Sequence, residues 1–358
     1  MTFRRGVILF SWLGLLSACV SAASTPVNTP TPPLAKELVL YNWADYMPQT
    51  VLDAFTAEYG VKITYLPYES QEEAVAQIEA GQTYDVAVIE NDQVPTLIAR
   101  HLLAEIDQRH VPNFKNIGDN FRGLIFDPDD RYSVPYSWGT TGLLVRTDLI
   151  GAPVTRWADL WNPRFAGKIA LRAQPTELIS VALKSLGYAL NSENPAELEA
   201  ALKRLLELKA VSRFVDVEAE SAVAPLVSGE AVILIGWPGD ALVARRQNPA
   251  IHYLLPAEGS MLWGDRLVIS ASSPNRYTAE LFLNFLLRPD IGGQIVNENR
   301  YAIANEAARA FIDPEILNDP VIYPPHAILA STDWYVPLSP AGQKLYDEAW
   351  ARFREAGQ

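Results

Sequence analysis

The sequence predicts an α/β fold with two lobes, and two observations carry this prediction. Near the N-terminus, short apolar runs alternate with segments of helical periodicity, which is the pattern of a parallel sheet flanked by helices. The same rhythm returns after residue 166. Two such units in a chain of 358 residues fit two packed lobes, because domains commonly hold about 100–200 residues.

The first unit is predicted as strand 37–41, helix 48–59, strand 61–65, helix 70–80 and strand 84–89. Gly60 ends the first helix, since glycine favours the turn that follows a helix. Ser70 and Glu73 form a capping box at the start of the second helix. The last strand is a short continuous apolar run, which indicates burial on both faces.

The second unit is predicted as strand 167–172, helix 175–186, helix 194–208, strand 231–237 and helix 239–247. Asn194 followed by Pro195 is typical of a helix start, with the cap residue first and proline at the first helical position. No internal sequence repeat relates the two units.

The pattern of the N-terminal segment predicts that the protein is exported from the cytoplasm. Arg4 and Arg5 precede an apolar run that ends in Ser17, Ala18 and Cys19, as in a secretory signal peptide. The segment resembles the lipobox of bacterial lipoproteins, in which the cysteine is acylated. We therefore expect a signal peptide over residues 1–18. Residues 19–36 are expected to form a disordered tether, rich in Ser, Thr, Ala and Pro, that begins with the acylated Cys19. A membrane-spanning helix is the alternative, but it needs about 20 apolar residues.

The composition limits which classes of ligand or partner the protein can bind. Cys19 is the only cysteine, so the mature body has no disulfide and no thiolate metal site. The formal net charge is −13, and it falls to −15 without the two arginines of the leader. This charge disfavours nucleic acid and attracts cations. Nine Trp and 15 Tyr with excess carboxylates suit a site for an organic cation, although acidic surfaces also serve solubility alone.

Enzyme signatures are missing from the sequence. The four histidines do not form a paired metal-binding spacing, and no G-x-S-x-G nucleophile elbow occurs. Gly167-Lys168 is followed by Ile169 where a phosphate loop needs Ser or Thr. We expect no catalytic residue, no metal and no cofactor.

Three segments place a carboxylate beside an aromatic residue near strand ends. They are YNWADY at 41–46, WPGD at 237–240 and LWGD at 262–265. In open α/β sheets, ligands lie in the crevice outside the carboxyl ends of the strands. A tryptophan at one such position is more often a core residue. Three repeats of the pattern favour a shared ligand cleft.

These segments also carry a family resemblance. Together with 68–70 (YES), 84–88 (YDVAV), 134–142 (VPYSWGTTG), 157–161 (WADLW), 284–290 (NFLLRPD) and Tyr301, they resemble the bacterial spermidine/putrescine-binding proteins of ABC transporters. The likeness covers nearly all of residues 37–357.

The resemblance implies a type II-like periplasmic-binding-protein fold with the ligand cleft between the lobes. The chain would cross between lobes near residues 136–139 and 263–267. We expect lobe 1 to comprise 37–136 and 266–305, and lobe 2 to comprise 137–265 and 306–358.

The resemblance also implies ligand residues. The carboxylates expected to hold ammonium groups are Asp45, Glu177, Asp240 and Asp265. The aromatic residues expected to enclose the methylenes are Trp43, Tyr46, Trp237, Trp263 and Tyr301. Asp240 matches a carboxylate of the putrescine-selective members.

The chain departs from the family pattern at five further candidate positions, which are Ala44, Glu90, Asp92, Gln174 and Tyr335. Glu90 and Asp92 stand where Ser and Tyr are common. If either faces the cleft, it adds negative charge; if it faces solvent, it is a surface charge. Gln174 stands where spermidine binders have Asp, and Tyr335 replaces a Gln.

The expected function is capture of putrescine, spermidine or both by a monomeric, lipid-anchored protein that delivers the ligand to an ABC permease. The envelope is either a periplasm or a Gram-positive-like surface. The alternatives are another small cation or solute in the same fold, such as thiamine, an amino acid derivative or a sugar, and a secreted glycosidase with two cleft carboxylates.

Overall fold

The protein is described by a computed structural model that covers residues 32–44, 46–215, 219–329 and 331–356. The chain divides into Met1–Pro33 and a larger compact body, Leu34–Gln358. The fold and the site described below belong to this body. In the residues described, no helix is both long and apolar enough to cross a membrane.

The elements predicted for the first unit are confirmed. They are β1 (Glu37–Trp43), α1 (Gln49–Tyr59), β2 (Lys62–Tyr68), α2 (Gln71–Glu79) and β3 (Val86–Glu90). Gly60 ends α1 with a φ of 69°, in the left-handed region that glycine enters without strain. The Ser70 hydroxyl accepts a hydrogen bond from the Glu73 amide at the start of α2.

The second unit also agrees with the prediction. It contains β5 (Ile169–Arg172), α4 (Pro175–Ser185), α5 (Pro195–Lys209), β7 (Ile233–Gly236) and α7 (Pro238–Gln247). The Asn194 side chain caps α5 by accepting from the Ala196 amide at 2.9 Å. β6 (Ser212–Val215) and α6 (Ala219–Ser228) complete this part of the chain.

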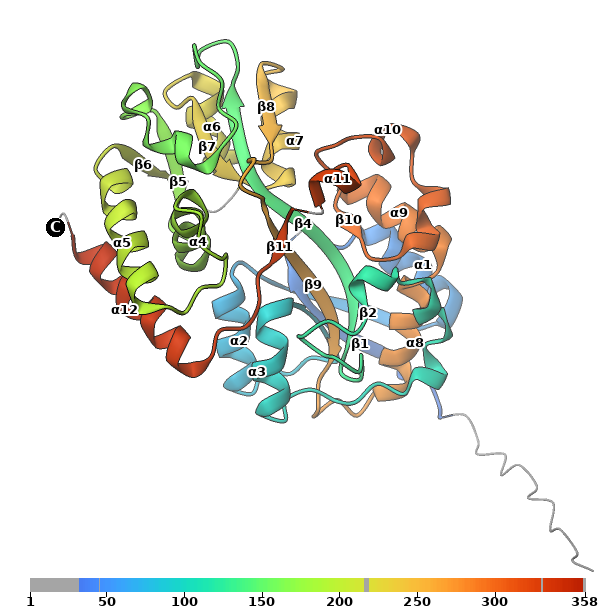
Figure 1. Ribbon diagram of the computed structural model, residues 1–358. Helices are drawn as coiled ribbons and strands as arrows, with labels where there is room; N and C mark the ends of the chain where they lie inside the picture. Colours follow the sequence, from blue (N-terminus) through green and yellow to red (C-terminus); the bar gives the residue numbers. More distant parts are fainter. Residues whose placement is uncertain (1–31, 45, 216–218, 330, 357–358) are drawn as a thin grey trace, which may run out of the picture. The chain divides into compact units, whose positions relative to one another are not determined.

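Two long antiparallel strands join the two units. β4 (Ser133–Arg146) and β9 (Met261–Ile269) pair with each other at the centre of a sheet whose strand order is β2-β1-β3-β9-β4-β7-β5-β6. β3 pairs with β9, whereas the far half of β4 pairs with β7 and with β8 (Ile251–Leu254). Figure 1 shows β4 and β9 running side by side between the two groups of helices.

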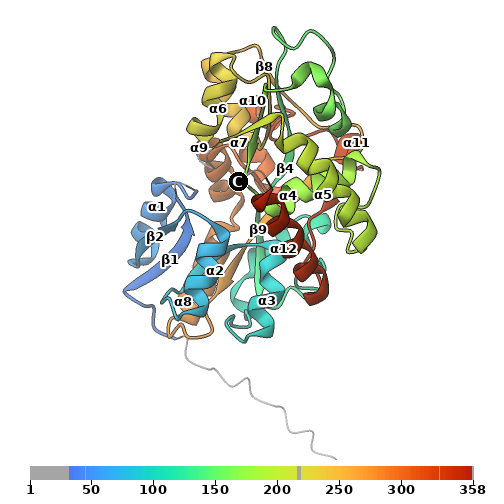
Figure 2. The same cartoon turned by 90° about the vertical axis from the view of Figure 1, so that its left-hand side faces the viewer.

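Short elements and the C-terminal helices complete the fold. They are α3 (Val94–Ala99), α8 (Arg276–Leu286), α9 (Pro289–Asn299), β10 (Ala302–Ile303), α10 (Pro314–Leu317), α11 (His326–Leu329), β11 (Asp333–Trp334) and α12 (Pro340–Glu355). α12 packs on α4 and α5, as both views show (Figures 1 and 2). β11 pairs with the start of β9.

Apolar side chains form a separate core on each side of the central strands. One core contains Phe55 of α1 and Phe282 of α8, both fully buried. Another contains Trp157, Leu178 and Phe353, which come from three distant parts of the chain. The strand ends between these cores carry the side chains considered next.

Candidate functional site

Asp265 lies near the middle of β9 and is 4% exposed. The Tyr46 hydroxyl donates a hydrogen bond to its Oδ2 at 2.7 Å. Burial raises the pKa of Asp265 to about 6, although hydrogen bonds from Tyr46 and Trp43 act in the opposite direction. The first and third carboxylate–aromatic segments are therefore brought together, as the sequence predicts.

A second carboxylate stands directly opposite Asp265. In the antiparallel pairing of β3 with β9, Glu90 and Asp265 are register partners. Side chains of directly opposed residues project from the same face of a sheet. Burial raises the pKa of Glu90 well above its usual range, and the charges of Asp92, Asp265 and Glu72 add to the effect. Glu90 thus faces the same side as Asp265, rather than standing as an isolated surface charge.

Asp92 lies two residues beyond, in the short helical turn that follows β3, and it is half-buried. Burial raises its pKa as well. Its hydrogen-bond partner is Gln93, whose side-chain amide donates at 2.9 Å. Two of the departures from the family pattern, Glu90 and Asp92, therefore bring negative charge to the neighbourhood of Asp265.

Glu177 supplies a carboxylate from the other unit. It lies in the first turn of α4 and is 7% exposed. Its Oε1 accepts hydrogen bonds from the Thr141 hydroxyl and the Trp237 indole N–H, both at 2.8 Å. Burial raises its pKa above the usual range, against the effect of these two donors. Thr141 is a contact that the sequence did not predict, although it lies in the segment 134–142.

Asp240, which the sequence predicts to hold a ligand ammonium, already has a cationic partner within the protein. It lies in the first turn of α7 and is 1% exposed. Both of its oxygens accept from the Arg172 guanidinium, at 2.8 and 2.5 Å. The Trp237 amide donates to the same carboxylate at 2.7 Å. Arg172 was missed by the sequence reasoning, and its position at the end of β5, next to the α4 start, is the signal that points to it.

The aromatic residues connect these carboxylates. The rings of Tyr46 and Tyr301 meet edge to face at 5.0 Å between centroids, and Trp263 lies 6.4 Å from Tyr301. The Tyr301 hydroxyl fills the space that a side chain at Gly239 would need. Burial raises the pKa of Tyr301 to about 12, and the charges of Asp240 and Asp265 contribute. Tyr301 therefore lies between the two carboxylates.

The remaining candidates take varied positions. Asp45 lies outside the described residues, next to the exposed Ala44. Gln174 is half-buried at the N-cap of α4. The Tyr335 hydroxyl contacts the Met261 sulfur at 3.0 Å. Burial raises the pKa of Tyr335, and the Glu177 charge adds to it, so this residue lies near the site.

Arg266 leaves the charge of its neighbour Asp265 uncompensated. Strand alternation predicts that adjacent residues face opposite sides of a sheet. Arg266 is 1% exposed and donates to Asp130 at 2.8 Å and to the Ser133 hydroxyl at 2.6 Å. Its charge is therefore used on the other face, as alternation predicts.

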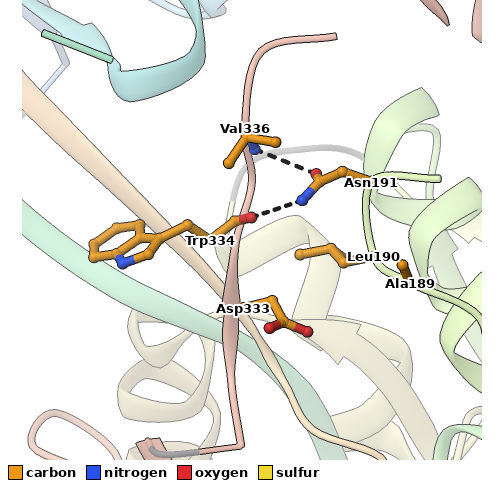
Figure 3. A pocket seen from close by; sticks show the side chains of 6 residues that line it. All are labelled: Ala189, Leu190, Asn191, Asp333, Trp334 and Val336. Atoms are coloured by element: carbon orange, nitrogen blue, oxygen red, sulfur yellow. Dashed lines mark hydrogen bonds between the residues drawn. The ribbon is translucent and has the colours of Figure 1, made fainter. Parts of the chain in front are cut away.

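A cavity of about 400 Å³ lies elsewhere, between the α4–α5 connection and β11. Figure 3 shows Asn191 reaching the backbone on both sides of Tyr335, donating to the Trp334 carbonyl at 2.8 Å and accepting from the Val336 amide at 3.2 Å. Asp333, on the same wall, pairs with Lys184. The side chains of Asn191 and Asp333 are already bonded within the protein, so the carboxylate site is the stronger candidate.

Gly139 allows Trp263 to lie against β4. A Cβ at this position would overlap the six-membered ring of the Trp263 indole. We therefore expect Gly139→Ala to displace the indole from its present place and weaken ligand binding by roughly tenfold, since a misplaced packing surface costs about 1–3 kcal/mol. Gly60→Ala strains the backbone at φ 69° and so lowers stability, but it adds no contact to any neighbouring atom and should leave the affinity of the folded protein unchanged. Titration of both variants checks the prediction, and equal affinities would contradict it.

Comparison with known proteins places this geometry in a family context. The family model for bacterial extracellular solute-binding proteins matches residues 50–322. The spermidine/putrescine-binding periplasmic protein of Escherichia coli K12 is 33% identical over 345 residues, covering 95% of this chain and 96% of that one.

Solved structures show the same likeness. The substrate-binding protein PotD of a spermidine/putrescine ABC transporter from Streptococcus pneumoniae has a TM-score of 0.80 and 28% identity, covering 89% of this chain and 99% of that one. The Tp0655 (TpPotD) lipoprotein of Treponema pallidum also has a TM-score of 0.80, with 26% identity and coverage of 88% and 99%. The predicted α/β fold of periplasmic-binding-protein type is confirmed by these likenesses.

Proposed function

The chain belongs to the bacterial extracellular solute-binding protein family, and from this premise we propose that it captures a polyamine and delivers it to an ABC importer. One observation carries the proposal. Glu90 at the end of β3, Asp265 in the middle of β9 and Glu177 in the first turn of α4 are carboxylates beside aromatic side chains, and no ion pair reaches any of them within the described ranges. A bound organic dication or trication supplies the missing positive charge.

The chemistry of a polyamine matches these groups. Each ammonium offers several N–H donors, and charge-assisted hydrogen bonds to carboxylates are the strong ones. Asp265, Glu177 and Glu90 are assigned to the ammonium groups, together with Asp45. Burial, and after it the charges of neighbouring carboxylates, raise the pKa values of Glu90 and Asp265, so a cation relieves repulsion as well as adding bonds.

The aromatic residues are assigned to the methylene segments. They are Trp43, Tyr46, Trp237, Trp263 and Tyr301. The ring contacts of Tyr301 with Tyr46 and Trp263 and the bond from the Trp237 indole to Glu177 support this assignment. Such rings cover apolar stems and attract cations, with about 0.5–2 kcal/mol for each cation–ring contact. The ligand is bound and released unchanged in this proposal. Relatives that match over nearly their whole length and are named as spermidine/putrescine-binding proteins support the choice of ligand.

We also assign the two lobes as the resemblance implies, with 37–136 and 266–305 in one and 137–265 and 306–358 in the other. Glu90 then belongs to lobe 1 and Glu177 to lobe 2, and Asp265 is the last residue of lobe 2 before the chain crosses to lobe 1. Closure by hinge motion would bury the ligand between them. The neighbouring β4 and β9 are the strands that would bend.

Calorimetric titration of the purified protein with putrescine, spermidine, thiamine and a neutral sugar tests the function. One-to-one binding of a polyamine with micromolar or tighter affinity is the expected result. Binding of thiamine or the sugar in preference to both polyamines would show a re-purposed pocket in the same fold. Absence of polyamine binding would overturn the proposal.

We further propose that a lipid on Cys19 anchors the protein outside the cytoplasm. Cys19 lies outside the described residues, and the support is the lipobox-like segment at 16–19 together with the structural relative named as a lipoprotein. Cys19→Ser should move the protein from the membrane fraction to the soluble or secreted fraction, because it removes the acylated thiol. Fractionation checks this, with Ser17→Ala as a variant that keeps the cysteine. An unchanged membrane-bound share would contradict the anchor.

A further inference from the structure

Arg172 and Asp240 form a bidentate ion pair inside the candidate site. The guanidinium is 0% exposed and the carboxylate 1% exposed. Both guanidinium NH₂ groups donate to the carboxylate, at 2.8 and 2.5 Å, in the parallel geometry that makes Arg–carboxylate pairs strong. Gly236 makes room for the pair, because a side chain there would meet Asp240 Oδ2 at 2.6 Å. Asp240 is therefore saturated by a cation that belongs to the protein.

This ion pair touches the residues assigned to the ligand. The Arg172 guanidinium lies 4.5 Å from the centroid of the Trp237 ring, in a cation–π contact. The Trp237 indole N–H donates to Glu177. The charges of Asp240 and Arg172 both act on the pKa of Tyr301, Asp240 raising it and Arg172 lowering it. The guanidinium thus lies against an aromatic ring and a carboxylate. This is the kind of environment that suits a ligand ammonium.

The other carboxylates of the site differ in this respect. Glu177 accepts from neutral donors, and Asp265 accepts from the Tyr46 hydroxyl. Within the part of the chain that the structure describes, Glu90 has no ion pair either, and it stands opposite Asp265. Among these four carboxylates, Asp240 is therefore the one with an ion pair in the described residues, although the Arg172 charge also acts on Glu177.

We propose that Arg172 is a specificity-determining residue whose guanidinium takes the place of a ligand ammonium at Asp240. The ligand's ammonium groups are then held by Glu177, Asp265 and Glu90, and the ligand uses the face of Trp237 that Arg172 leaves open. The inference rests on the proposed polyamine function. It changes the role of Asp240, which becomes a positioning residue that holds Arg172 and caps α7.

A double-mutant cycle tests this assignment. The purified wild-type protein is compared with Asp240→Asn, Arg172→Met and the double variant by titration with putrescine and spermidine. The ion pair has no net charge, and the double variant replaces it by two uncharged side chains. The double variant should therefore bind within about threefold of wild type. Asp240→Asn alone removes the negative charge of this ion pair and keeps the guanidinium charge close to the ligand, so affinity should fall roughly tenfold or more.

Arg172→Met alone exposes Asp240 to the ligand. The ratio of spermidine to putrescine affinity should then rise by roughly tenfold, because a further ammonium gains a carboxylate partner. A folded double variant that loses more than tenfold in affinity would show that Asp240 itself binds the ligand, and would overturn the inference. Failure of the wild type to bind either polyamine would instead overturn the proposed function, and this inference with it.

Circular dichroism shows whether the uncharged variants fold. If they do not, Arg172→Lys is the variant used for the test. Lysine keeps the positive charge at this position, so the ranking of the two polyamines should stay that of the wild type. A ranking altered in Arg172→Lys by as much as tenfold would contradict a role for the charge of Arg172.

Discussion

Replacing Asp265 by asparagine is expected to weaken polyamine binding by at least roughly 30-fold, or about 2 kcal/mol, as for the loss of one partner of a buried charge pair. The substitution keeps the size of the side chain and an oxygen that can accept from the Tyr46 hydroxyl, now 2.7 Å away. It removes the charge that an ammonium needs. Because Asp265 is 4% exposed, solvent screens the lost interaction poorly.

A matched control separates this effect from a change in net charge. Glu199→Gln removes a carboxylate from an exposed ion pair with Arg352, whose side chains are 60% and 57% exposed. Its affinity for polyamine should equal that of the wild type. The unfolding midpoint of Asp265→Asn without ligand at pH 7 should be unchanged or higher, because a buried charge has been removed. Wild-type affinity in Asp265→Asn would remove Asp265 from the site.

The second large expected effect is that bound ligand reverses the way in which the free energy of unfolding depends on pH. The pKa of Asp265 is raised to about 6 in the native protein, against about 3.9 in an unfolded chain. Between these values the native state holds a proton that the unfolded state lacks, so the stability of the ligand-free protein falls as pH rises through this range. The difference corresponds to about 3 kcal/mol for this group.

The raised pKa values of Glu90, Asp92 and Glu177 act in the same direction. Carboxylates with lowered pKa act in the opposite direction, but at lower pH; the pKa of Asp107, for example, is about 2. Between pH 4.5 and 7 the raised groups therefore set the slope. Thermal unfolding of wild type and Asp265→Asn over this range checks it, and the slope should be smaller in the variant.

Polyamine binding requires the ionised carboxylates, so affinity should rise from pH 5 to pH 7 while the ligand itself stays protonated. Binding at pH 5 should release protons, which calorimetry in two buffers of different ionisation enthalpy measures directly. With saturating polyamine, stability should rise over the pH range in which the free protein loses it. Binding without proton release at pH 5 would show that Asp265 is already ionised in the empty site.

The regular elements were predictable from local pattern. Gly60, Ser70 and Asn194 mark helix ends by their own chemistry, and the structure places helix boundaries within about two residues of those marks. The 14-residue strand β4 was not predicted as one element. It is buried along its whole length and is interrupted by Pro135 and two glycines, so neither alternation nor composition identifies it.

The site was predictable only in part, for a similar reason. Residue types near strand ends indicated which side chains gather, and Tyr46 does meet Asp265. The orientation of Glu90 depends on the register between β3 and β9, which local sequence does not encode. The pairing of Arg172 with Asp240 joins residues 68 positions apart. Such contacts follow from the packing of β5 against β7, and no spacing rule reports them.

The placement of β9 between β3 and β4 also constrains the order of folding. Its residues 265–269 pair with residues 86–90, so one edge of β3 has no partner until the chain has been synthesised past β9. Until then a strand made of apolar side chains exposes unpaired backbone groups, which is the state that aggregates most readily. Contacts so distant in sequence also form slowly. The nascent chain therefore carries an open and mostly apolar strand edge for most of its synthesis.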